Sequence, residues 1–384
     1  MNLSILDFTK KFFLYFCNFI FKFTKINNKK ILFINFNGKG YGDNPKSVCE
    51  YLRKNYPDLD LVWLADSIEG FPSGVRAVKY GSIKAFFEQA TSKVWIYNTR
   101  AFARLNKRNG QYFVQLWHGS IGFKFLESEA NMPEYYIKQA QYDGKVTDLM
   151  VSDSLLQTED FATHFWYNGQ IEEFGMPRND TLFNLKDDFD FQNILKDRLQ
   201  LPHGSKIVLF APTFRDSGDI SYLHIDFNQL IKNLESNINE DVVLLIRLHP
   251  NVANKSSIIN FNDKIKNVSF YGDMQELLII SDLLITDFSS SITDFILLNK
   301  PFIRFAMDLS IYKKERGLTN LYFELPDKLV ENENELFEIS KNIWFTFNYS
   351  EIQDFKKNKL KPVFDGKSSE KIGEIVYKIC QSNS

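Results

Sequence analysis

The strongest constraint on the fold is an alternation of short apolar runs with helical stretches, which begins near residue 30. The apolar runs have the length and the β-branched and aromatic composition of buried strands. Helical stretches such as 46–55 and 83–90 separate them. Five strands are expected here: ILFINF (31–36), LVWLA (61–65), KVWIY (93–97), YFVQLW (112–117) and LMVS (149–152). This alternation predicts a parallel sheet with helices on both faces.

The series restarts after a polar segment, 184–203, which we interpret as a linker with one helix. The second set of expected strands is KIVLFAP (206–212), VVLLIRLHP (242–250), NVSFYG (267–272), DLLITD (282–287) and PFIRFA (301–306). The sequence therefore predicts an α/β protein with two Rossmann-like, doubly wound domains, 29–183 and 184–345, that face each other across a cleft. A C-terminal helical segment is expected at 346–384.

Residues 1–28 differ from the rest in charge. Six lysines and one aspartate lie in the first 30 residues, whereas the whole chain of 384 residues carries a net charge of −2. At helical spacing the apolar side chains share one face and the lysines the other, as in Phe12, Phe16, Phe19 and Phe23 against Lys11, Lys22 and Lys25. The apolar run is shorter than the roughly 20 residues that span a bilayer. We expect an in-plane amphipathic helix on an anionic membrane surface; packing on its own domain or on a partner is the alternative.

Composition excludes several classes of function. The slightly negative net charge argues against a broad nucleic-acid-binding surface. The three cysteines, Cys17, Cys49 and Cys380, have no metal-type spacing and indicate a reduced, cytosolic protein. In the loop GKGYGDNP (38–45) the glycine spacing does not fit a dinucleotide fingerprint, so we interpret it as an acceptor-side loop that contains Asp43.

A second informative stretch is ITDFSSSITDF (285–295), where a buried strand is followed by serines and a helix start. The first N–H groups of a helix are unpaired and attract anions, so Ser289 and Ser290 are candidates for a phosphate site. Helix capping alone is the plainer reading, and it is compatible with phosphate binding. Asp287 and Asp294 are candidates for a divalent cation, but their spacing does not demand one, and no metal site is predicted.

Two histidines lie at expected strand ends. His118 follows the run 112–117 and precedes Gly119, which suits a general base; a structural histidine bonded to a loop carbonyl is the alternative. In RLHP (247–250), Arg247 and His249 share one face of a strand and suit a diphosphate. The alternative for Arg247 is an ion pair at the sheet edge.

Two further motifs contain arginines. In APTFRD (211–216), Thr213 and Arg215 are candidate phosphate or ribose contacts, although a turn capped by Asp216 explains the motif nearly as well. FGMPRND (174–180) joins the two halves, and Arg178 either reaches the cleft or belongs to a hinge.

Taken in order, WHGS, FGMPRND, APTFRD, RLHP and ITDFSSSITDFILLNKPFI resemble the CDP-glycerol glycerophosphotransferase family of teichoic-acid primases, polymerases and capsule enzymes. The resemblance covers residues 30–340. It implies a GT-B-type fold with an acceptor-side first domain and a nucleotide-binding second domain, attached peripherally to the cytoplasmic face of a bacterial membrane. The chain lacks the large extra N-terminal region of the long polymerases, which favours a primase or capsule-type enzyme.

The resemblance also implies roles for single residues. His118 and His249 would be the catalytic histidines, with His118 as the base. The donor would be held by Arg247, Ser289 and Ser290, with Thr213, Arg215 and Asp287 in second rank. The acceptor side would contain Gly119, Lys124 and Asp43, with Lys124 in place of the lysine in the commoner WHGT-x-x-K run.

The predicted reaction moves glycerol phosphate from CDP-glycerol to a hydroxyl of a lipid-linked glycan or growing polymer and releases CMP. It requires no cofactor, and a divalent cation is optional. The alternatives are transfer from CDP-ribitol, a GT-B glycosyltransferase that uses a nucleotide sugar, and a non-enzymatic assembly subunit. A homo-oligomer is compatible with all of them.

Overall fold

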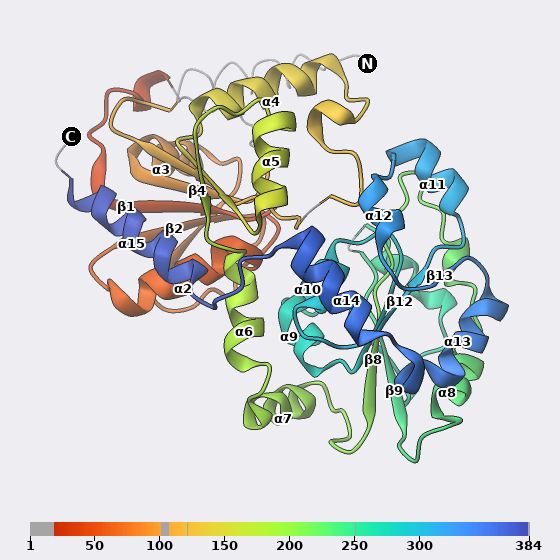
Figure 1. The fold of residues 1–384 in the computed structure, drawn as a ribbon. Helices are drawn as coiled ribbons and strands as arrows, with labels where there is room; N and C mark the ends of the chain where they lie inside the picture. Colours follow the sequence, from red (N-terminus) through yellow and green to blue (C-terminus); the bar gives the residue numbers. More distant parts are fainter. Residues whose placement is uncertain (1–18, 101–106, 121, 250, 383–384) are drawn as a thin grey trace.

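The computed structural model describes residues 19–100, 107–120, 122–249 and 251–382. It contains two parallel sheets, each covered by helices, which lie side by side in Figure 1. The predicted α/β architecture with two doubly wound domains is confirmed. Most of the expected amphipathic helix, residues 1–18, lies outside the described residues.

The first sheet has seven strands in the order β3-β2-β1-β4-β5-β6-β7, all parallel. The strands are β1 (Asn27–Ile34), β2 (Asp60–Ala65), β3 (Val75–Lys79), β4 (Ser92–Tyr97), β5 (Tyr112–Gln115), β6 (Leu149–Ser152) and β7 (Gln170–Glu173). The five strands expected from the sequence are the central ones. The outer strands β3 and β7 were not predicted, because exposed positions interrupt their apolar pattern.

Helices cover both faces of this sheet: α2 (Asp43–Asn55), α3 (Ile83–Thr91), α4 (Glu134–Val146), α5 (Leu155–His164) and the C-terminal α15 (Ser368–Gln381). The last helix therefore returns to the first domain, where it lies beside α2 (Figure 1). Ile372 and Val376 of α15 are fully buried in the same core as Ile31 and Leu52. The expected C-terminal segment also contains α14 (Tyr349–Phe355) and the π-helical turn η5 (Lys356–Leu360).

The second sheet has six parallel strands in the order β10-β9-β8-β11-β12-β13. They are β8 (Lys206–Phe210), β9 (Val242–Ile246), β10 (Ile265–Asn267), β11 (Leu283–Thr286), β12 (Phe302–Phe305) and β13 (Leu329–Val330). The prediction of a strand at 267–272 is wrong, because the strand in this region is β10 and ends at Asn267. Phe270 lies in a turn and is 79% exposed.

The connecting helices are α6 (Asp180–Leu185) and α7 (Phe189–Arg198), and the second domain contains α8 (Phe227–Glu235), α9 (Met274–Ile280), α10 (Ser291–Ile296), α11 (Leu309–Arg316), α12 (Asn320–Glu324) and α13 (Glu333–Thr346). Short 3-10 turns are η1 (Glu127–Glu129), η2 (Pro177–Asn179), η3 (Ser221–Leu223) and η4 (Ala253–Ile258). Within the described residues, no helix combines the length and apolar composition needed to cross a bilayer.

The segment that contains Phe123 and Lys124, here called the strap, comes after β5 in the first domain and contacts the second domain. Lys124 forms an isolated antiparallel bridge with Leu318, and the Thr319 amide donates to the Phe123 carbonyl at 3.0 Å. The Phe123 side chain is buried in the core of the second domain. The carboxyl ends of both sheets consequently meet, as they do where ligands bind in open α/β folds.

Candidate functional site

His118 lies at the carboxyl end of the first sheet, three residues after β5. Its Nδ1 is 2.8 Å from the main-chain carbonyl of Asn98, which follows β4. Because a carbonyl only accepts hydrogen bonds, Nδ1 must carry the proton, and Nε2 keeps a free lone pair. The carbonyl contact considered as a purely structural alternative therefore fixes the tautomer that a general base needs.

The protonation of His118 is set by opposing effects. Burial lowers its pKa from the ordinary value of 6.5. The bond to the Asn98 carbonyl and the charge of Asp43 act in the opposite direction, whereas the charge of Arg178 lowers the pKa further. The net direction is downward, so the imidazole is neutral at neutral pH and able to accept a proton.

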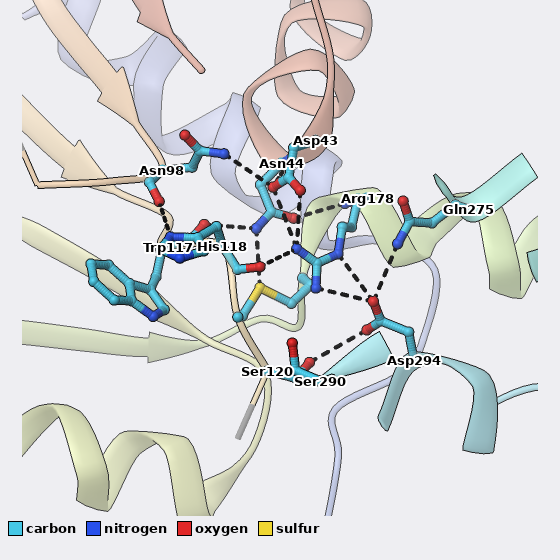
Figure 2. A network of polar contacts seen from close by, with 12 residues as sticks. Asp43, Asn44, Asn98, Trp117, His118, Ser120, Arg178, Gln275, Ser290 and Asp294 are labelled. Atoms are coloured by element: carbon cyan, nitrogen blue, oxygen red, sulfur yellow. Dashed lines mark hydrogen bonds and ion pairs between the residues drawn. The ribbon is translucent and has the colours of Figure 1, made fainter. Parts of the chain in front are cut away.

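Asp43 and Arg178 surround the main chain of His118 (Figure 2). The Arg178 guanidinium lies 3.2 Å from the Asp43 carboxylate and donates to the His118 carbonyl at 2.5 Å. It also forms an ion pair of 3.0 Å with Asp294 of α10. The carboxylate of Asp43, for which an acceptor-side role stays a prediction, is thus engaged by arginine. The sequence suggested Asp294 only as a candidate for a cation, and its pairing with Arg178 was not predicted, because a partner 116 residues away leaves no local signal.

On the opposite side of the interface, Arg247 and His249 follow β9. Arg247 donates to the Tyr271 carbonyl at 2.7 Å, and among the described residues it forms no ion pair. The sheet-edge ion pair considered as an alternative is therefore absent there, and donors of the guanidinium remain free for a ligand. His249 is exposed and stacks on Phe214, with ring centroids 5.4 Å apart. Partial desolvation, Lys124 and Arg247 lower its pKa.

The motif 211–216 forms a buried network instead of an open phosphate site. Arg215 is 3 % exposed; its guanidinium pairs with Asp287 at 2.9 Å and with Asp308. The Thr213 amide donates to the same Asp287 carboxylate at 2.8 Å. The structure thus places Arg215 and Asp287, two of the predicted donor contacts, in ion pairs that brace the ends of β8 and β11, and their contact with a donor stays a prediction.

The two candidate serines lie between β11 and α10. The Ser289 hydroxyl accepts from the amide of Ser291, the first residue of α10, at 3.2 Å. Ser290 makes no capping bond. A Cβ atom placed on Gly119 would lie 3.9 Å from the Ser290 hydroxyl. The WHGS loop of the first domain (117–120) and the serine turn of the second (289–291) are therefore direct neighbours.

Lys124 was expected on the acceptor side, but the strap places it against the second domain. Its ammonium group lies 5.5 Å from the centre of the Tyr312 ring, and no carboxylate of the described residues pairs with it. Burial lowers its pKa to about 8, against the opposing effect of Asp287. Its charge lowers the pKa of His249, so Lys124 lies near His249, and its predicted role stays open to test.

A metal site is not evident in the part of the chain that the structure describes, where no group of three or more His, Cys, Asp or Glu side chains has suitable geometry. The two carboxylates considered for a cation are engaged otherwise: Asp287 pairs with Arg215, and Asp294 pairs with Arg178. Positive side chains supply the charge at this interface.

Known proteins resemble this chain along almost its whole length. The family model of CDP-Glycerol:Poly(glycerophosphate) glycerophosphotransferase matches residues 15–378. A teichoic acid glycerol-phosphate transferase of Staphylococcus aureus is 33% identical, with 92% of this chain and 95% of the relative covered. A teichoic acid poly(glycerol phosphate) polymerase of Staphylococcus epidermidis is 31% identical over 92% of this chain, which spans 51% of that relative.

Solved structures agree with these relatives. The wall teichoic acid polymerase TagF superposes with a TM-score of 0.86 at 28% identity, over 99% of this chain and 99% of that chain. That structure is a variant soaked with CDPG. A UDP-GlcNAc 2-epimerase of Methanocaldococcus jannaschii, 14% identical with a TM-score of 0.54, shares the fold.

Proposed function

We propose, from the premise that the chain belongs to the CDP-glycerol:poly(glycerophosphate) glycerophosphotransferase family, that it transfers glycerol phosphate from CDP-glycerol to a hydroxyl group and releases CMP. The acceptor is a lipid-linked saccharide or a growing polyol-phosphate polymer of the teichoic-acid type. The observation that carries this proposal is the contact between the loop of His118 and the serine-bearing start of α10: a Cβ atom on Gly119 would lie 3.9 Å from the Ser290 hydroxyl, and the Ser120 hydroxyl donates to Asp294 at 3.4 Å.

In the proposed reaction the acceptor hydroxyl oxygen attacks the phosphorus that bears glycerol. His118 Nε2 takes the hydroxyl proton, a new P–O bond forms, and the P–O bond to CMP breaks with its electron pair on the CMP phosphate. Phosphoryl transfer depends mainly on positioning and on stabilising charge at the phosphate oxygens. Arg247, Lys124 and His249 supply that stabilisation, with Ser290 at the edge of the acceptor loop. No cofactor is required.

The test of the proposal is CMP release from CDP-glycerol and CDP-ribitol, with a synthetic lipid-linked acceptor. CMP release from CDP-glycerol alone supports the proposal. CMP release from CDP-ribitol alone would show the same reaction with ribitol phosphate as the transferred group. A nucleoside diphosphate released from a nucleotide sugar, with no CMP from either donor, would instead identify a glycosyltransferase.

We expect a bell-shaped pH dependence of kcat/KM. His118 accepts a proton only when neutral, so activity is lost as the pH falls through its lowered pKa. Lys124 carries charge only when protonated, so activity declines as the pH rises through about 8. Lys124→Arg should move the alkaline limb to higher pH, because a guanidinium stays protonated.

A matched control for this limb is Lys300, whose pKa burial also lowers to about 8. Its ammonium donates to the carbonyls of Ile279 and Ser281, away from the site. Lys300→Arg should leave the alkaline limb in place. A limb that moves with Lys300→Arg, or stays in Lys124→Arg, would contradict the role given to Lys124.

The protein is proposed to act at the cytoplasmic face of the membrane, held peripherally by its N-terminal segment. Phe19 and Phe23 are 57% and 79% exposed, their rings contact each other, and Lys22 and Lys25 are exposed beside them. Exposed aromatic rings with flanking lysines suit an anionic bilayer surface.

Replacing both rings, Phe19→Ser with Phe23→Ser, should weaken sedimentation with phosphatidylglycerol vesicles by about 10-fold or more, since burial of an aromatic side chain contributes about 1.5–3 kcal/mol. The control is Phe345→Ser in α13, which is 67% exposed on the second domain. Equal binding by both variants would contradict a membrane role for these residues.

A further inference from the structure

A buried polar network crosses the interface between the domains, and Arg178 lies at its centre (Figure 2). Arg178 belongs to η2, the short turn that joins the two halves of the chain. Its guanidinium pairs with Asp43 at the start of α2 and with Asp294 of α10. In the second of these pairs the side chains are only 7% and 4% exposed. Because desolvation offsets the attraction in such pairs, their clearest contribution is a fixed geometry.

The network holds the main chain on both sides of the His118 α-carbon. Arg178 donates to the His118 carbonyl at 2.5 Å, and the side-chain amide of Asn44 donates to the Trp117 carbonyl at 2.9 Å. Asn44 in turn accepts from the Arg178 main-chain amide at 3.1 Å. Asn98, whose carbonyl fixes the imidazole, also donates to Asp43 at 3.2 Å. The groups that orient His118 are thus linked to Arg178, Asp43 through its guanidinium and Asn44 through its main-chain amide.

The same network extends into the second domain through Asp294. Its carboxylate accepts from Asn179 at 2.7 Å, from Gln275 at 3.3 Å and from Ser120 at 3.4 Å, in addition to Arg178. Asp294 lies in the first turn of α10, immediately after the serine turn of the donor side. Ser120 is two residues after His118. Asp294 therefore contacts both the acceptor loop and the joining segment from the donor-side helix.

We propose that Asp294 and Arg178 are positioning residues for His118, which lock the WHGS loop onto the donor-side helix so that base and donor phosphate hold one relative position. The proposal rests on the proposed function, in which His118 is the base. Neither residue touches substrate; both act through the His118 main chain. The Arg178–Asp294 ion pair crosses the interface, so it forms only when the two domains are in contact.

The test compares Asp294→Asn and Arg178→Lys with Asp327→Asn. The control breaks the Arg304–Asp327 pair, which is equally buried in the second domain, with side chains 2% and 5% exposed, but makes no contact with the network. For the two positioning variants kcat of CMP release should fall by about 10²-fold, the loss typical of a small misplacement at a distance, while KM for CDP-glycerol stays unchanged. Asp327→Asn should keep the wild-type kcat.

A double variant separates positioning from general damage. In a His118→Ala background, Asp294→Asn should cause no further loss of kcat, because a residue that acts through His118 has nothing left to position. An equal loss in both backgrounds would overturn the proposal. So would a loss in Asp327→Asn as large as that in Asp294→Asn.

Hydrogen exchange gives a readout that does not depend on activity. Asp294→Asn, a change in the second domain, should accelerate amide exchange in the first-domain peptide that contains 116–120, and Asp327→Asn should not. Unchanged exchange in this peptide overturns the positioning role whether or not CMP is released. Absence of CMP release by the wild type, with accelerated exchange in Asp294→Asn, would overturn the proposed reaction and keep the coupling between the domains.

Discussion

His118→Ala should lower kcat for CMP release by about 10²–10⁴-fold, the contribution of a positioned general base. The structure supports this size of effect, because the Asn98 carbonyl fixes the Nδ1 proton and leaves Nε2 as the only basic atom of the ring. Binding of CDP-glycerol should change little, since Arg247 and His249 belong to the second domain and the side chain of Lys124 lies against it. The measurement is steady-state CMP release together with donor affinity by calorimetry.

The control for His118→Ala is His203→Ala. His203 is half exposed, lies in the second domain and pairs with Asp197 at the surface. It should retain wild-type kcat. The pH dependence of the residual activity of His118→Ala is a further check. If kcat/KM still falls at low pH as in the wild type, another group takes the proton. An unchanged kcat in a folded His118→Ala protein would remove His118 from the reaction.

The fold was predictable wherever strands are buried on both faces. In β1 and β4 the apolar run is continuous, because residues such as Leu32 and Ile96 contact helices or neighbouring strands on every side. The outer strand β7 has the sequence QIEE and no apolar pattern, so its pairing with β6 is set by the sheet rather than by its own residues. Phe270 shows the opposite error, an apolar residue that tertiary structure leaves in an exposed turn.

The site was predictable as a set of strand ends, but its pairings were not. The sequence identified His118 and the serines because they follow predicted strands, and Arg247 because it lies near the end of one; in the structure β9 ends at Ile246, so Arg247 follows it. It could not show that Arg215 is neutralised by Asp308, which is 93 residues away. It also could not show that the strap after β5 carries Lys124 into the second domain, since that depends on the bridge to Leu318. Local patterns give the position of a side chain along a strand, whereas its partner is set by packing of distant segments.

The second large effect concerns donor binding. Arg247→Ala should lower kcat/KM for CDP-glycerol by about 10²–10³-fold, the cost of removing a preorganised donor from charged oxygens in a reacting group. One N–H of its guanidinium is held by the Tyr271 carbonyl, which fixes the plane of the group and leaves other donors free. Arg247→Lys should lower kcat/KM less, because the lysine keeps the positive charge. A loss should remain, because an ammonium group lacks the planar pair of donors.

The matched control is Arg198→Ala in α7, an exposed arginine that contacts the Tyr271 hydroxyl and Glu276. Arg198→Ala should retain wild-type kcat/KM. Because Arg198 and Arg247 both contact Tyr271, a loss in Arg198→Ala would show that the effect of Arg247→Ala arises from disturbing Tyr271. Calorimetry with CDP-glycerol should show weakened binding for Arg247→Ala but not for His118→Ala. If Arg247→Ala bound the donor normally and lost only kcat, the guanidinium would act on the transition state alone. Wild-type values of both would place the donor phosphates away from β9, and the two sides of the interface would need to be reassigned.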